Sequence, residues 1–302
     1  MSAPALVLVA HGTRSTRGVE MIAELAGAVA RELGASALAH GVRGDIAETG
    51  AGADFGAASA SLREIAAVSD GGTAAVFDGG TAAVFDGGTA AVFDGGTAAV
   101  GAPRVRTAFV DVLGPSPAEV LRDLDPVPAV VVPAFLASGY HVYQDVPREV
   151  AASAHSAVAV TQAMGPDPAL AEVMHLRLRA AGWRPGDAVV FAAAGSSDAR
   201  ARRDVQRAAS LLSERVGTTA HLAYIATGEP KVPEVVAAVR ASGAHRVFVA
   251  SYLLAHGLFH QRLHEAGADG VAEPIGVHPA VVRLLTDRYF AAIDSLTAVR
   301  VA

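Results

Sequence analysis

The sequence predicts an α/β fold made of two similar doubly wound parallel-sheet domains, related by internal duplication, with a cleft between them. Three observations predict it. Short apolar strands alternate with amphipathic helices, strand-and-turn motifs recur in the same order in both halves, and polar residues follow the ends of strands. Alternation of strand and helix implies parallel sheets with right-handed crossovers.

Composition sets the outer limits of the interpretation. The 302 residues are 52% apolar and 18% charged, enough for two ordinary domains with a substantial core. The chain has no cysteine, which excludes disulfides, thiolate metal ligands and cysteine nucleophiles. A net charge of -6 without a basic stripe argues against nucleic acid as a partner. No apolar run approaches the roughly 20 residues of a membrane span, and the N-terminus lacks a signal peptide's basic region. We therefore expect a cytoplasmic monomer with no membrane partner.

The first strand ends in a histidine. The run from Leu6 to Arg14 reads LVLVAHGTR, and its five apolar residues suit a strand buried on both faces. His11 follows at the carboxyl end of that strand, where open α/β sheets bind their ligands. Apolar residues at helical spacing then predict a helix from about Val19 to Leu33, and Gly34 is expected to end it.

A stretch of different composition follows, from about residue 35 to 103. It is rich in Ala, Gly and Ser, and the octapeptide DGGTAAVF occurs at Asp70, Asp78 and Asp86, with a truncated copy from Asp94. One Asp per unit distinguishes it from calcium-binding repeat arrays. We interpret it as a low-complexity surface insertion, with a small β-rich excursion as the alternative, and assign it no function.

The remaining elements follow from periodicity and turn residues. Further strands are predicted at about residues 105–113, 129–133, 188–193, 220–225 and 246–254. Further helices are predicted at about residues 117–124, 205–216, 233–241 and 279–296. The segment FLASGYHVYQDVP, residues 135–147, is expected to be a loop that carries a second strand-end histidine, His141.

The two halves match in motif order. AHGTR at Ala10 corresponds to AAGSS at Ala193, and PAFLASGYH at Pro133 corresponds to SYLLAHGLF at Ser251. We therefore divide the chain into a domain at residues 1–160, which contains the insertion, and a domain at residues 161–302. The first copy carries three potential ligands at its strand ends, and the second carries apolar residues there: His11, Asp111 and His141 against Ala194, Ile225 and Phe259. This asymmetry predicts one site, made by the first half and closed over by the second.

The three polar residues suit metal binding and proton transfer. Two neutral imidazoles and a carboxylate make an open site for a divalent ion such as Co, Fe, Ni or Zn, and they can also accept protons. Taken singly, each has a plainer interpretation, since a strand-end histidine often bonds to backbone and Asp111 could cap a helix. The difference between the halves favours function.

These motifs resemble a known family. LVLVAHGTR, the GPSP turn at Gly114 and VVVPAFLASGYHVYQDVP are similar to the CbiX-type sirohydrochlorin chelatases, ATP-independent class II enzymes, in their long two-domain form. The resemblance implies chelatase-like domains around a tetrapyrrole cleft and insertion of Co²⁺ or Fe²⁺ into sirohydrochlorin, toward cobalamin or sirohaem. The metal is then a substrate, and no ATP or organic cofactor is needed. By motif, His11 and His141 would bind metal and accept protons. Asp111 would replace a residue that is often glutamate in the family.

Sirohydrochlorin is rich in carboxylates, so an acidic protein needs local donors to bind it. The first half offers Gly12, Thr13, Arg14, Arg17, Gly139, Tyr140 and Arg148, and the second half offers Gly195, Ser196, Ser197, His260 and Arg262. The alternative for each arginine is a solvated surface charge. His256, His260 and His264 would align as a metal relay on a continuous helix, but we expect His256 in a loop and His264 on the surface.

Two other functions stay open. A non-catalytic carrier of metal or tetrapyrrole would need the same histidines. A histidine-type phosphatase also places a histidine before glycine at the end of its first strand, but that chemistry wants an arginine immediately before the histidine. This chain has Ala10 there.

Overall fold

The computed structural model describes residues 3–13, 15–48, 102–111 and 113–299. Residues 49–101, which contain the repeats of the insertion, and Arg14 lie outside the described residues. Within the described part, no helix is long and apolar enough to cross a membrane.

Two four-stranded parallel sheets form the fold, and this confirms the predicted fold class. The first has the order β2-β1-β3-β4, from β1 (Ala5–His11), β2 (Val105–Val110), β3 (Ala129–Pro133) and β4 (Val158–Val160). The second has the order β6-β5-β7-β8, from β5 (Ala188–Gly195), β6 (Ala220–Thr227), β7 (Val247–Tyr252) and β8 (Gly270–Val271). The strand orders correspond one to one, as a duplication requires.

Helices cover both faces of each sheet. Those of the first half are α1 (Thr16–Glu48), α2 (Pro117–Leu124) and α3 (Val146–Ser153), and a one-turn π-helix, η1 (His141–Asp145), precedes α3. Those that follow are α4 (Pro168–Ala180), α5 (Ala199–Val216), α6 (Val232–Ala241), α7 (Leu258–Leu263) and α8 (Pro279–Val299). Helix α2 begins at a capping box, in which Ser116 and Glu119 satisfy each other's backbone N–H groups.

Two local predictions are wrong. Gly34 does not end the first helix, because α1 continues to Glu48. A glycine inside a helix costs only about 1 kcal/mol relative to alanine, and the alanine-rich residues after it favour helix. Residues 135–147 are not simply a loop, since they contain η1 and the start of α3. The sequence pattern does not predict η1, because a π-helical turn interrupts the apolar spacing of an α-helix.

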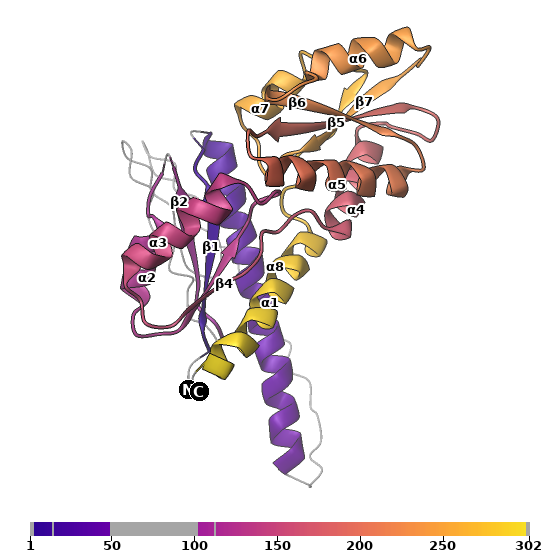
Figure 1. Ribbon diagram of the computed structural model, residues 1–302. Helices are drawn as coiled ribbons and strands as arrows, with labels where there is room; N and C mark the ends of the chain where they lie inside the picture. Colours follow the sequence, from indigo (N-terminus) through magenta and orange to yellow (C-terminus); the bar gives the residue numbers. More distant parts are fainter. Residues whose placement is uncertain (1–2, 14, 49–101, 112, 300–302) are drawn as a thin grey trace, which may run out of the picture.

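The two halves exchange their last helices. Helix α4 follows β4 of the first sheet but packs on β7 and α5 of the second, whereas α8 follows β8 and packs on α1, β3 and β4 of the first (Figure 1). The domain limits at residues 1–160 and 161–302 stay a prediction. With these limits α4 packs within its own half, and the structure adds that α8 of the second half lies against the first sheet.

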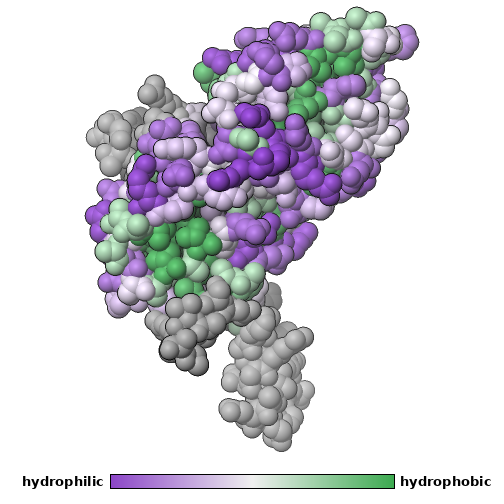
Figure 2. Space-filling model, viewed as in Figure 1, coloured by the Kyte–Doolittle hydropathy of each residue, from purple (hydrophilic) through white to green (hydrophobic). Residues whose placement is uncertain are grey.

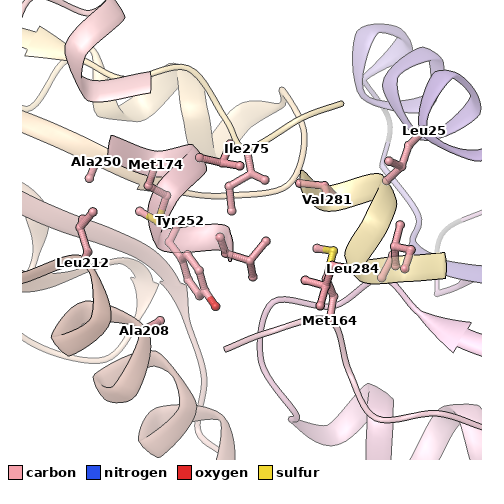
Figure 3. Packing of buried hydrophobic residues seen from close by; sticks show 14 of the residues in the cluster. Leu25, Met164, Met174, Ala208, Leu212, Ala250, Tyr252, Ile275, Val281 and Leu284 are labelled. Carbon is pink, nitrogen blue, oxygen red and sulfur yellow. The ribbon is translucent and has the colours of Figure 1, made fainter. Parts of the chain in front are cut away.

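One apolar cluster runs through both halves. It joins residues of β1 and α1 to α8, and continues through α4 into α5 and β7. In Figure 3, Leu25 of α1 lies beside Val281 and Leu284 of α8. On the side of the second half, Tyr252 of β7 lies beside Met174 of α4. The hydroxyl of Tyr252 donates to the Leu136 carbonyl at 2.7 Å, which ties β7 to the segment that leads to His141. The shared core therefore fixes the strand ends of one half relative to the other.

Candidate functional site

The three predicted ligands lie together at the carboxyl edge of the first sheet. His11 is the last residue of β1, Asp111 follows β2, and His141 begins η1 after β3. Because β1 lies between β2 and β3 in the sheet, these ends are neighbours. The His11 and His141 ring centroids are 5.0 Å apart at an interplanar angle of 79°.

The His11 and Asp111 side chains face each other in a way that suits a cation between them. The Nδ1 atom of His11 lies 2.7 Å from the Gly12 carbonyl, which can only accept, so Nδ1 carries a proton. In the neutral ring the lone pair is then on Nε2, and Nε2 faces the Oδ2 atom of Asp111 at 3.3 Å. Two acceptors at this distance are satisfied by a proton or a metal ion between them. The His11 side chain is 47% exposed and that of Asp111 is 56% exposed, so the pair is open to a ligand.

Asp111 has an uncommon backbone conformation. Its φ of 79° lies in the left-handed region, which aspartate tolerates better than most non-glycine residues. The Gly12 N–H donates to the Val110 carbonyl at 3.0 Å, which holds the β1 and β2 ends together next to this residue. Such conformations gather at functional sites, and here it accompanies a carboxylate placed beside His11.

A buried carboxylate orients His141. The Nδ1 atom of His141 lies 2.7 Å from Oδ2 of Asp145, whose side chain is 12% exposed. An ionised carboxylate only accepts, so Nδ1–H donates and Nε2 is left free for a metal ion or a proton. Phe135 stacks on the His141 ring with centroids 6.0 Å apart, which also restricts the ring.

Asp145 is the functional residue that sequence reasoning missed. Its signal is the spacing of four residues after His141, but that spacing has meaning only on a helix, and the segment was interpreted as a loop. Arg148, predicted to bind substrate carboxylates, donates to Oδ1 of Asp145 at 2.9 Å. Since the Arg148 side chain is still 63% exposed, its remaining donors face solvent. Its predicted substrate role stays a prediction.

The predicted substrate-binding residues of the first half lie around the pair. Gly12 and Thr13 directly follow His11, and the Thr13 side chain approaches Gly257 of the second half. Tyr140 is exposed, with its ring centroid 6.1 Å from that of His141. Gly139 touches the second half, because a Cβ there would stand 3.2 Å from Cβ of Ala201. A Cβ at Gly139 would be tighter than an ordinary contact, so Ala201 of the second half would have to shift slightly.

Residues that follow β5 and β7 of the second half lie next to the segments that follow β1 and β3 of the first. Ser196 lies near Gly139, with its Oγ 3.8 Å from the position of a Cβ there, and Ser197 is exposed. The Arg202 guanidinium donates to the Ser197 carbonyl at 2.7 Å. Ala194, Ile225 and Phe259, which correspond to the three ligands, are partly buried against an apolar cluster of the second sheet. The second half thus presents apolar residues where the first presents ligands.

The second-half histidines form a separate row. The rings of His256, His260 and His264 are spaced 5.1 Å from one to the next, although His256 precedes α7. His256 pairs with Glu273 at 3.0 Å, and His260 is only 5% exposed, with Nε2 donating to the Ala272 carbonyl at 3.2 Å. Burial lowers the pKa of both His256 and His260. The structure therefore places the predicted substrate-binding residue His260 in the interior of the second half, against the Ala272 carbonyl, and His264 is exposed.

No group of three or more His, Asp or Glu side chains in the described residues is arranged as a ready-made metal site. What the strand ends offer is the pair of His11 Nε2 and Asp111 Oδ2, 3.3 Å apart, with the His141 ring centroid 5.0 Å from that of His11.

Fold and site together define a class: a duplicated α/β protein with one histidine pair at the strand ends of its first sheet, facing a second sheet without ligands. A family model, described as CbiX, matches residues 89–181 and again residues 188–292. The chain belongs to the CbiX family. The double match also agrees with the internal duplication.

Solved structures share this fold over nearly the whole chain. SirB from Bacillus subtilis with Fe³⁺ is 18% identical, with a TM-score of 0.63, covering 97% of this chain and 96% of that one. SirB from B. subtilis subspecies spizizenii in complex with cobalt is 17% identical, with a TM-score of 0.59 and the same coverage. A CbiX described as the terminal enzyme of sirohaem biosynthesis in denitrifying bacteria is 18% identical, with a TM-score of 0.55, covering 96% and 99%. No curated protein sequence matches the chain.

Proposed function

We propose that this CbiX-family protein inserts a divalent metal ion, Co²⁺ or Fe²⁺, into sirohydrochlorin without ATP, on the way to cobalamin or sirohaem. The observation that carries the proposal is the His11–His141 pair with its two carboxylates, at the strand ends where the halves meet. The related structures with Fe³⁺ and cobalt support metal as a substrate.

Metal insertion requires both a metal donor and a base. His11 Nε2 and Asp111 Oδ2 converge on one point and would hold the incoming ion. Insertion releases two N–H protons from the macrocycle, so a base nearby lowers the barrier. The free Nε2 of His141 would take one of the two protons, and the resulting imidazolium keeps its Nδ1–H bond to Asp145. The second proton would pass to His11 Nε2 once the metal ion has left it for the macrocycle, and from there to solvent. That buried carboxylate stabilises the positive charge as it forms.

The test is anaerobic absorbance of sirohydrochlorin with Co²⁺ or Fe²⁺, with and without protein. We expect the wild type to accelerate the spectral change of metal insertion, and His11→Ala and His141→Ala each to reduce the rate by about 100-fold or more. His221→Ala, which removes an exposed histidine of β6, is the matched control and should behave as wild type. The ratio of the Co²⁺ and Fe²⁺ rates ranks the metals.

The same experiment separates the carrier alternative. A carrier would bind sirohydrochlorin or metal and leave the insertion rate at the protein-free value. Retention of the full rate in both His11→Ala and His141→Ala would contradict the site assignment. The histidine phosphatase has no support, since Ala10 stands where that chemistry needs arginine.

A further inference from the structure

The start of α5 contacts the segment that leads to His141. The backbone N–H of Ser138 donates to Oδ2 of Asp204 at 2.8 Å, and Gly139 lies against Ala201. These two contacts fix one face of α5 next to η1. Arg200 is four residues before Asp204, so it lies on that same face.

Arg200 is held in place by an aromatic ring of the first half. Its guanidinium carbon lies 4.5 Å from the centroid of Tyr143, a residue of η1 only two positions after His141. The Tyr143 side chain is itself about half exposed. Stacking uses the flat face of the guanidinium and leaves its N–H groups, which lie in the plane, free to donate at the edge.

The charge of Arg200 has no protein counter-ion among the described residues. Further along α5, Arg207 pairs with Glu214 and Arg215 with Glu172, whereas no carboxylate in the described chain stands within ion-pair distance of Arg200. Its neighbours Arg202 and Arg203 are also exposed and lack a carboxylate partner in this part of the chain. Figure 2 shows strongly hydrophilic side chains gathered where the start of α5 meets the first half.

We infer that Arg200, stacked on Tyr143, binds a peripheral carboxylate of the tetrapyrrole and so orients the macrocycle over the histidine pair. This rests on the proposed function. The metal goes to the centre of the macrocycle, and the carboxylates lie on its rim, so their partners belong beside the histidines. Arg200 meets this condition, since it comes from the opposite half and lies on the face of α5 that contacts Ser138 and Gly139, just before His141. A guanidinium edge binds a carboxylate through two parallel hydrogen bonds, which fixes orientation as well as affinity.

The test compares Arg200→Ala with Arg207→Ala, a matched control on the same helix. We expect Arg200→Ala to raise the KM and the Kd for sirohydrochlorin by about 10- to 100-fold, with kcat at saturation little changed. Arg200→Lys should lie between, because it keeps the charge and loses the fork. Added salt should weaken wild-type binding more than that of Arg200→Ala. Co²⁺ binding without tetrapyrrole should be equal in all the proteins, which shows that the histidine site is intact.

The outcomes separate this inference from the proposed function. If the wild type inserts metal and Arg200→Ala has the Kd and KM of Arg207→Ala, the inference is wrong and the proposed function stands. If the wild type binds sirohydrochlorin with an Arg200-dependent Kd and does not accelerate insertion, the inference stands and the proposed function fails. Loss of Co²⁺ binding in Arg200→Ala would show general disruption and overturn the assigned role.

Discussion

His11 and Asp111 face each other as two hydrogen-bond acceptors, with Nε2 and Oδ2 3.3 Å apart. The Gly12 carbonyl accepts a hydrogen bond from the Nδ1–H group of His11, so the lone pair of the neutral ring is on Nε2. A proton or a metal ion between these two atoms would satisfy both acceptors. The pair is therefore where we expect the incoming metal ion to bind.

Asp111→Asn keeps the shape of this pair and removes its charge. We expect Co²⁺ affinity to fall roughly 10-fold or more, since a carboxylate next to a cation contributes substantially even near solvent. Titration with Co²⁺ followed by d–d absorbance or calorimetry measures the effect. Asp123→Asn, at an exposed aspartate of α2, is the control. Equal affinity in Asp111→Asn and wild type would show that Asp111 does not contact the ion.

Asp145→Asn tests the orientation of His141. The amide cannot stabilise an imidazolium and allows the ring to change tautomer, so we expect the metal affinity or insertion rate to fall by about 10- to 100-fold. The pH profile of the insertion rate should also differ between Asp145→Asn and the wild type. A purely structural defect would lower the rate without changing the profile. Arg148→Ala should have a smaller effect, because it removes the outer partner of Asp145 and leaves the bond to His141. A larger loss in Arg148→Ala would contradict this order.

Stability should fall as the pH drops below about 6.5, the unperturbed histidine pKa. Burial lowers the pKa of His256, His260 and His278, so the unfolded chain binds protons at these positions before the folded protein does. The free energy of unfolding is therefore highest above that pH and decreases as the pH falls through the folded pKa values. Thermal unfolding from pH 7.5 to 5.5 measures this. His260→Gln, which can still donate to the Ala272 carbonyl, should flatten the profile, and an unchanged slope would contradict the role of His260.

Leu285→Ala should destabilise both halves together. Leu285 is fully buried in α8, within the cluster that spans both sheets. Removing such a side chain costs about 2 to 5 kcal/mol. We expect urea unfolding to remain a single transition with a lower midpoint concentration of urea. Circular dichroism and the fluorescence of Trp183, in the second half, monitor this transition. Asp287→Ala, on the exposed face of α8, is the control. Two separated transitions would show that the helix exchange does not couple the halves.

Much of the site could be predicted because its chemistry sits at strand ends. Apolar runs fix where the strands lie, and parallel pairing brings the residues that follow adjacent strands to one edge. This is why His11, Asp111 and His141 could be placed together before the fold was known. Asp145 could not, since its relation to His141 depends on a π-turn that leaves no periodic apolar signal. The position of His260 could not be predicted either, because spacing alone does not say whether a histidine faces a ligand site or an interior carbonyl.

The sequence by itself determined the class of fold, the duplication, and the presence of strand-end ligands in only one half. Each of these follows from local patterns of apolar and polar residues. Only the tertiary structure decided which helix packs on which sheet. Helix α4 packs on the second sheet and α8 on the first, through the apolar cluster that spans both halves. The tertiary structure also places Arg200 of one half over the ring of Tyr143 of the other. Contacts between residues far apart in the chain depend on the path of the backbone in three dimensions, and local sequence patterns do not predict that path.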